Sequence, residues 1–381
     1  MMPSRGYRTR NHEWIDVLSA LSPLIKEMGL KSLIQDDELD NNGLNFANCD
    51  IHCQLIVRAV EKLLESKSAD IKAVQNLLKG LLNRKTMVGA FCELAAYDWL
   101  MRYDFGVKIQ IPLDKNSVLG KSGSIVDGQL SLLFGQAYFD VKSFGFHGQM
   151  ALRLKERLEG LIPGKAVSIE ESWDVSIDEF ELLVENPTPI IKKLLQNGMA
   201  RYGRMTIFCR ERQPIMVSSH VVNPYLLAQE NSLYPFKYSN QFACKVPFLL
   251  IFVVHPWLGQ GELHTNFSGT GSHFTRALAR RTFMQYVHDK SPAADICDKV
   301  RDGVTLAEAS QSLSGIVFAN IWPKGCDDEE NHIHPSWIYL NPRATHPLAR
   351  SQFSLLYANG ATNVDIDDFE FDNYPLDKPK P

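Results

Sequence analysis

Seven consecutive apolar residues, FLLIFVV at positions 248–254, place the strongest constraint on how this 381-residue chain can fold. An uninterrupted apolar run rich in β-branched and aromatic residues is typical of a central strand that is buried on both faces of a sheet. His255 and Pro256 interrupt the wider apolar segment, which is therefore shorter than the roughly 20 apolar residues that a membrane-spanning helix needs. The run indicates the centre of a folded core, and we expect no membrane association.

The spacing of apolar residues changes along the chain. Between residues 12 and 100 they recur at three- and four-residue intervals, which predicts helices with a break near Gly80 and Asn83. Strands are predicted at 107–113, 124–134 and 136–144, and a late strand pair at LSGIVFANIW and SWIYLNP. We therefore expect an α/β fold with a mixed central sheet flanked by helices, and a helical N-terminal region.

Composition limits the compartment and the partners. The net charge of −4 and the isoelectric point near 6.3 provide no overall basic surface, so any binding of a polyanion must use a local patch. The seven cysteines are an odd number and are widely spaced, which is typical of reduced thiols. The first residues contain no apolar secretory segment. We expect a cytoplasmic protein.

Asp140 and Lys142 are two charged residues inside the otherwise apolar and aromatic strand segment AYFDVKSF. Strand alternation puts both on one face, and it puts Asp127 of the preceding segment on the face that would pair with them. Two carboxylates held together in a half-buried place repel each other unless a cation joins them. Mg²⁺ suits such a pair, because it takes oxygen ligands from one or two carboxylates and from substrate phosphate.

A third carboxylate, Glu93, lies upstream on the predicted helix MVGAFCELAAYDWL. Its helical face also contains Gly89, Ala90, Ala96 and Tyr97, and this mostly small-residue face suits close packing against a sheet. A glutamate in the middle of such a face needs a partner, and a bound metal ion or its water would serve.

The order of these residues resembles the PD-(D/E)xK nuclease superfamily, which shares the restriction-endonuclease-like fold. Its pattern is a helical glutamate, an aspartate on one strand, and Asp/Glu-x-Lys on the paired strand. Glu93, Asp127, Asp140 and Lys142 match that pattern in order, and Val126 stands where the family often has proline. The resemblance implies a restriction-endonuclease-like core.

The resemblance also implies roles for these side chains. Asp127, Asp140 and the backbone carbonyl of Val141 would bind Mg²⁺, with Mn²⁺ as a substitute, and Glu93 would complete the site directly or through water. Lys142 would orient the attacking water, deprotonate it if burial and the metal lower its pKa, or offset charge in the transition state. The expected reaction is metal-dependent hydrolysis of a phosphodiester.

The resemblance is firm over roughly residues 81–145 and weakens beyond them. Around it we expect a helical N-terminal region at 1–80, a nuclease core with insertions at 81–345, and an acidic C-terminal tail at 346–381.

Two further clusters have two interpretations each. Arg153, Lys155 and Arg157 follow the motif strand and are candidates for contacts with a nucleic-acid backbone, although a solvated helix face explains them as well. Cys326, His332 and His334 lie close together in sequence and could bind zinc or could form a polar loop. The sequence does not decide either case.

The expected function is that of a Mg²⁺-dependent nuclease, and the leading hypothesis is a DNA endonuclease of prokaryotic restriction or anti-phage defence. One alternative is a nuclease effector subunit, in a homo-oligomer or a defence complex, that a partner protein or ligand activates. Another is a non-catalytic nucleic-acid-binding scaffold, against which the complete set of acids and lysine speaks. The sequence contains no recognisable helix-turn-helix or zinc finger, which favours the gated effector over a sequence-specific restriction enzyme.

Overall fold

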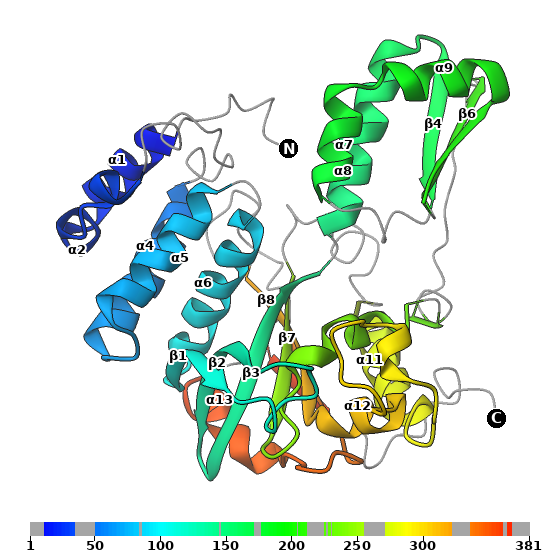
Figure 1. Cartoon of the computed structure of the whole chain (residues 1–381). Coiled ribbons are helices and arrows are strands. Elements are labelled where there is room, and N and C mark those ends of the chain that lie inside the picture. The colour runs from blue at the N-terminus through cyan, green and yellow to red at the C-terminus, as the bar shows by residue number, and fades with distance from the viewer. Residues whose placement is uncertain are drawn as a thin grey trace. The chain divides into compact units, whose positions relative to one another are not determined.

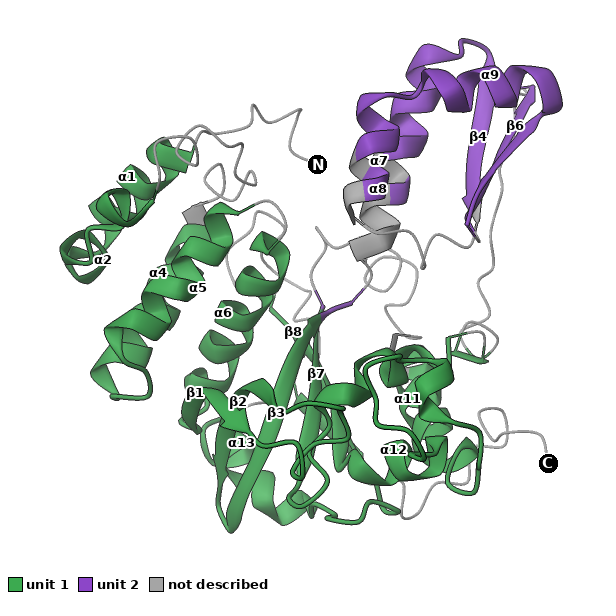
Figure 2. Cartoon of the chain, in the orientation of Figure 1, with its two compact units in different colours: residues 1–142, 224–253, 269–381 green, residues 143–223, 254–268 purple. Residues whose placement is uncertain are grey.

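The computed structural model describes residues 11–34, 50–83, 86–144, 146–170, 177–203, 205–211, 225, 228–229, 231–254, 271–321, 336–360 and 364–367. The chain divides into two compact units, shown in Figures 1 and 2. Unit 1 consists of residues 1–142, 224–253 and 269–381, and unit 2 of residues 143–223 and 254–268.

Unit 1 contains a mixed seven-stranded sheet in the order β1-β2-β3-β7-β8-β9-β10. Its strands are β1 (Gly106–Leu113), β2 (Ser124–Leu132), β3 (Gly135–Ser143), β7 (Phe248–Val254), β8 (Gly315–Asn320), β9 (Ser336–Leu340) and β10 (Val364–Asp367). β1–β2, β2–β3 and β8–β9 pair antiparallel, whereas β9–β10 pair parallel. All seven residues of the central β7 are buried, which confirms the central strand predicted from its sequence.

The β2–β3 hairpin closes at the predicted junction. Leu132 pairs with Gly135, so only Leu133 and Phe134 form the loop. Gly135 has a φ of 107°, a conformation that glycine adopts without the steric cost of a side chain.

Helices pack against this sheet (Figure 1). The N-terminal half of unit 1 forms α1 (Asn11–Leu21), α2 (Pro23–Glu27), a 3₁₀ turn η1 (Leu30–Leu33), α4 (Asp50–Glu65), α5 (Ile71–Leu82) and α6 (Met87–Arg102). α6 packs against α4 and α5 and also against β1, and most of its side chains are therefore buried. The predicted break between helices is confirmed, because α5 ends at Leu82 and Asn83 caps it.

The later part of unit 1 contributes shorter helical elements. They are the 3₁₀ turn η4 (Tyr234–Gln241), α11 (Gly271–Arg280), the π-helical turn η7 (Arg281–Gln285), the 3₁₀ turn η8 (Ala293–Asp295), α12 (Leu306–Ser312), the 3₁₀ turn η9 (Arg350–Phe353) and α13 (Ser354–Ala358). Among the described residues, none of the helices has the length and apolarity that crossing a bilayer requires.

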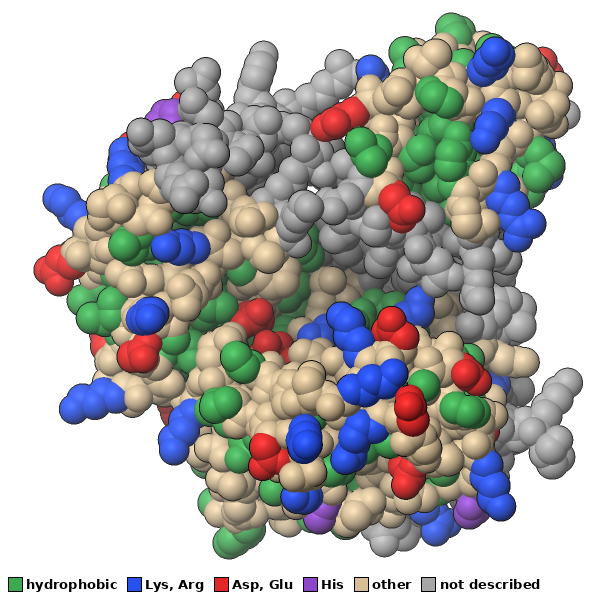
Figure 3. All heavy atoms as spheres, viewed as in Figure 1, with side chains coloured by type: hydrophobic (Ala, Val, Ile, Leu, Met, Phe, Trp, Pro, Cys, Tyr) green, Lys and Arg blue, Asp and Glu red, His purple; other side chains and the backbone are tan. Residues whose placement is uncertain are grey.

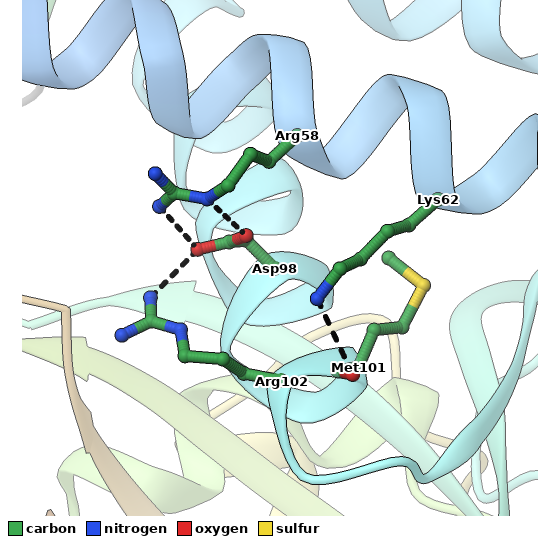
Figure 4. Close-up of polar contacts among 5 residues, drawn as sticks. All are labelled: Arg58, Lys62, Asp98, Met101 and Arg102. Carbon is green, nitrogen blue, oxygen red and sulfur yellow. Dashed lines mark hydrogen bonds and ion pairs between the residues drawn. The ribbon is translucent and has the colours of Figure 1, made fainter.

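A buried carboxylate holds α4 and α6 together (Figure 4). Asp98 on α6 is fully buried, and it accepts hydrogen bonds from Arg58 Nε and Nη2 at 3.1 and 2.9 Å and from Arg102 Nη2 at 2.6 Å. Burial alone would raise the pKa of Asp98, but the two guanidinium groups outweigh it and keep the pKa below its ordinary value. Lys62 of α4 adds a hydrogen bond to the Met101 carbonyl at the end of α6.

The two sides of this ion cluster should respond unequally to mutation. Asp98→Asn removes the buried charge and leaves two arginines that are 42% and 40% exposed, so we expect a loss of about 1–2 kcal/mol in the free energy of unfolding. The double substitution Arg58→Met/Arg102→Met leaves a buried carboxylate without a partner and should cost about 3–5 kcal/mol. Urea denaturation at pH 7 measures both losses, and an equal or reversed order would contradict this account.

The segment predicted as an acidic tail contributes structure at 364–367. Val364 and Ile366 are buried and Asp365 is exposed, and this alternation of period two allows β10 to extend the sheet beside β9. Arg276 of α11 donates a hydrogen bond to Asp367 at 2.6 Å, which ties the strand to the helix packed against it. Residues 368–381 lie outside the described part of the chain.

Unit 2 is a separate α/β body inserted into the predicted core. It contains α7 (Phe146–Leu161), β4 (Lys165–Glu170), α8 (Ile177–Glu185), α9 (Thr188–Asn197), β5 (Met199–Tyr202) and β6 (Met205–Glu211). The strands form an antiparallel sheet in the order β4-β6-β5. Its buried core includes Leu154, Leu158, Val167, Phe180, Ile190, Leu194, Ala200, Met205 and Ile207. The predicted region 81–345 therefore contains parts of two units, and the chain leaves unit 1 directly after Lys142.

Candidate active site

The register of the β2–β3 hairpin places Asp127 beside Asp140. Gly128 pairs with Phe139, so Asp127 and Asp140 face each other one position further from the hairpin loop. Asp127 Oδ2 accepts a 2.6 Å hydrogen bond from the Val141 backbone N–H, and its carboxyl group is within hydrogen-bonding reach of Asp140. The structure thus brings together the two aspartates that strand alternation predicted to meet.

Gly128 allows close packing beside this pair of aspartates. A Cβ atom at this position would lie 2.4 Å from the Phe139 ring and 2.7 Å from the Lys108 carbonyl oxygen. Glycine therefore lets the buried Phe139 ring lie against β2, directly next to Asp127. The packing fixes the two strands at the position where the acids face each other.

Lys142 neutralises part of the charge of this pair. Asp140 is fully buried, and the Lys142 ammonium group, whose side chain is 19% exposed, forms an ion pair with Asp140 Oδ2. The same ammonium lies 5.3 Å from the centre of the Tyr238 ring. Burial lowers the pKa of Lys142, but Asp140 and Asp127 outweigh burial and raise the pKa above its ordinary value. The lysine is therefore a stable cation here, which does not support the expected lowered pKa and a role as a base.

Glu93 approaches the same group of charges from α6. Its Oε2 accepts hydrogen bonds from Tyr97 Oη at 3.3 Å and from Gln110 Nε2 at 3.1 Å. Burial raises the pKa of Glu93 to about 7, with Lys142 lowering it and Asp140 raising it further. A carboxyl group with this pKa can hold or release a proton near neutral pH.

Ionisation of Asp127 is also opposed by its surroundings. Burial raises its pKa well above the ordinary value, and repulsion by Asp140 and Glu93 adds to the effect. The hydroxyl of Tyr97, which is fully buried, shares its one hydrogen between the Asp127 carbonyl oxygen at 2.9 Å and Glu93 Oε2 at 3.3 Å, and so connects α6 to β2. Three carboxyl groups inside the protein thus repel one another, and a single ammonium group, that of Lys142, offsets their charge. The group as a whole must therefore keep a proton or bind a cation.

The donor chemistry fits a hard divalent cation held by two carboxylates. Asp140 Oδ1 is buried, and with Asp127 ionised it accepts no hydrogen bond among the described residues. Mg²⁺ is commonly held by one or two carboxylates, with water and substrate phosphate completing its six ligands. Within the described ranges, no group of three or more His, Cys, Asp and Glu side chains is arranged to hold a metal ion. Asp127 and Asp140 are therefore the ligands that the geometry favours, and Glu93 is better placed to act through water.

The other predicted residues lie on unit 2 or outside the described chain. Lys155 and Arg157 are on α7, where Arg157 is exposed and the Lys155 ammonium lies 4.0 Å from a Glu159 carboxylate oxygen. The side chain of Arg153 is not among those described. Cys326, His332 and His334 fall in the undescribed range 322–335. On the face of unit 1 that Figure 3 shows, basic and acidic side chains are interspersed, as the overall charge suggests.

Two residues that contact the charged side chains of the site were not predicted as site residues. Gln110 lies in the predicted strand VKIQIPL, where alternation gives no sign that its side chain turns toward Glu93. Tyr238 lies in η4, over a hundred positions from Asp127 and close to Lys142 only in space. Neither contact leaves a recognisable signal in a single sequence.

Comparison with known proteins gave no relative: no family model matches the chain, and no curated protein or solved structure is significantly similar to it.

Proposed function

We propose that this chain is a divalent-cation-dependent nuclease with a restriction-endonuclease-like core. The observation that carries the proposal is the contact between Asp127 and Asp140 in a buried site, with the Lys142 ammonium bound to one of them. Carboxylates are placed this close at a cost in free energy, and such strained electrostatics are concentrated at functional sites. The helical Glu93 near the pair completes the order of residues typical of PD-(D/E)xK nucleases.

The chain's own residues have distinct tasks in this proposal. Asp127 and Asp140 hold the cation, which, when bound, polarises the scissile phosphate and lowers the pKa of a water molecule. The Val141 N–H fixes the orientation of the Asp127 carboxylate, so less freedom is lost when the ligands engage. Lys142 remains protonated and offsets the negative charge that develops on the phosphate. Glu93 binds a water molecule at the edge of the site and can accept a proton from it.

DNA is the proposed substrate, with a role in prokaryotic restriction or anti-phage defence and a place in the cytoplasm. These finer assignments depend on the family pattern, because fold and site chemistry alone do not define a biological role. The basic residues Arg153, Lys155 and Arg157 are proposed contacts to the nucleic-acid backbone.

Cleavage assays with plasmid, single-stranded DNA and RNA test the activity. We expect Mg²⁺ or Mn²⁺ to support cleavage of DNA, EDTA to prevent it, and Lys142→Ala to reduce the rate by about 10²–10³-fold, as the loss of one charge-stabilising donor does. Lys108→Ala is the matched control, because this exposed lysine lies on the neighbouring β1 and should leave the rate unchanged.

Cleavage that persists in EDTA, or a Lys142→Ala variant as active as the Lys108→Ala control, would contradict the proposal. Binding of nucleic acid without cleavage under every condition would favour the non-catalytic scaffold.

One observation favours a gated form of the same activity. The chain enters unit 2 at Ser143, the residue after Lys142, so a partner or ligand that moves unit 2 would act on the end of the catalytic strand. Cleavage that appears only after the addition of cell extract, and that still requires Lys142, would identify the gated effector.

A further inference from the structure

The pairing of β1 with β2 is interrupted at one position. Ile109 pairs with Gly128 and Ile111 pairs with Val126, but Gln110 and Asp127, which would face each other between them, do not appear in the ladder. Gln110 has a φ of 55°, in the left-handed region that non-glycine residues rarely occupy. The interruption is therefore located opposite a proposed cation ligand.

The positive φ of Gln110 has no ordinary local explanation. Among the described non-glycine residues, Lys67 and Asp104 share this conformation, and each follows the end of a helix, where a left-handed residue commonly terminates the helix. Gln110 instead lies inside a strand. Strained backbone of this kind persists where surrounding contacts impose it, and it is concentrated at functional sites.

The side chain of Gln110 shows what the unusual backbone achieves. Its Nε2 donates a hydrogen bond to Glu93 Oε2 at 3.1 Å, and the Tyr97 hydroxyl donates to the same oxygen at 3.3 Å. Glu93 Oε1 receives no hydrogen bond among the described residues. The Gln110 amide, together with a Tyr97 hydroxyl that is shared with the Asp127 carbonyl, thus occupies one oxygen of the carboxylate and leaves the other available.

We propose that Gln110 is a positioning residue, whose left-handed backbone directs its amide to Glu93 Oε2 and thereby leaves Glu93 Oε1 to hold a water molecule of the cation bound by Asp127 and Asp140. This inference rests on the proposed function. Residues that orient the groups around a metal in this way typically change metal affinity or activity by about 10–100-fold when they are replaced. A purely structural bulge would change stability and leave cation affinity alone.

Three variants separate these roles. Gln110→Gly removes the side chain and suits the positive φ, whereas Gln110→Asn also tolerates this backbone but is one methylene too short to reach Glu93. Asp104→Gly is the matched control, because it relieves a φ of 59° away from the strand. All three are expected to have melting temperatures equal to that of the wild type or slightly higher.

Mn²⁺ binding to the full-length protein, measured by electron paramagnetic resonance without nucleic acid, provides the readout. We expect Gln110→Gly and Gln110→Asn to weaken Mn²⁺ binding by about 10–100-fold and Asp104→Gly to leave it unchanged. In cleavage assays the same two variants should require more Mn²⁺ for half-maximal rate, while KM for DNA stays the same.

Wild-type affinity for Mn²⁺ in both Gln110 variants would overturn the inference and leave the proposed nuclease activity standing. A wild-type protein that neither binds Mn²⁺ nor cleaves nucleic acid would overturn both. Weakened binding in the Asp104→Gly control as well would assign the effect to general loosening of the fold, and would also overturn the inference.

Discussion

Asp127→Asn is expected to abolish cleavage and at the same time to stabilise the metal-free protein. The variant lacks one of the two charged cation ligands, so we expect the cleavage rate to fall by about 10³-fold. This corresponds to a loss of about 4 kcal/mol in transition-state stabilisation. The stability of the metal-free protein should rise because burial, Asp140 and Glu93 all oppose ionisation of Asp127. Replacement of functional residues that are held at such a cost commonly adds about 1–2 kcal/mol.

The asparagine keeps the contacts that the fold needs. Its amide oxygen can accept the Val141 N–H that Asp127 Oδ2 accepts now, and its amide nitrogen can donate to Asp140, which replaces a repulsion with a hydrogen bond. Asp127→Ala is the matched comparison, because it removes the repulsion but leaves the buried Val141 N–H without a partner, at a cost of about 1–3 kcal/mol.

Urea denaturation at pH 8 in EDTA, together with cleavage assays in Mg²⁺, tests this prediction. The expected order of stability is Asn above wild type and wild type at or above Ala, with neither variant active. An asparagine variant that is less stable than the wild type would show that the two carboxylates do not oppose each other in the folded protein.

The sequence predicted the parts of the fold and site that depend on local periodicity. The apolar run at 248–254 identified the central strand, and the adjoining strand segments 124–134 and 136–144 correspond to the β2–β3 hairpin. Alternation along the two hairpin strands placed Asp127 on the face of Asp140 and Lys142, because the side-chain period of a strand is two. The two-residue loop seen in the structure sets the register that puts Asp127 opposite Asp140.

The features that were missed depend on contacts between distant segments. The pKa of Lys142 depends on how much charge surrounds it in three dimensions, and no strand pattern indicates that Asp140 and Asp127 outweigh its burial. The φ of Gln110 is set by tertiary contacts that override strand propensity. The separate unit 2 consists of ordinary helices and strands, so its sequence resembles a continuation of the core.

Glu93 should give the stability of the metal-free protein a distinctive pH dependence. Its pKa is raised from 4.5 to about 7, so the folded chain keeps a proton that the unfolded chain has already released between these values. Stability that is present below pH 4.5 is therefore lost as the pH rises to about 7, by about 3 kcal/mol in total. Asp98, whose pKa is lowered, acts only below its unfolded value of 3.8 and does not affect this range.

His52 acts in the opposite direction within the same range. Burial lowers its pKa from 6.5 to about 4, so the unfolded chain gains a proton first as the pH falls, and stability is lost between 6.5 and about 4. The pH dependence of wild-type stability is therefore not diagnostic by itself, because His52 opposes Glu93 while Asp127, whose pKa is also raised, acts in the same direction as Glu93. The difference between the wild type and Glu93→Gln reports the glutamate together with its repulsion of Asp127, since glutamine does not titrate.

Denaturation of both proteins in EDTA from pH 4.5 to 8 measures this difference. We expect Glu93→Gln to gain on the wild type as the pH rises, by about 3 kcal/mol at pH 8, because only the wild type must lose a proton from Glu93. Mg²⁺ should reduce the gap at pH 8 and have little effect at pH 5, since a cation favours the ionised acids that repel one another in its absence. A gap that does not vary with pH would mean that Glu93 titrates as an ordinary surface carboxyl group, and the electrostatic basis of the site would then be lost.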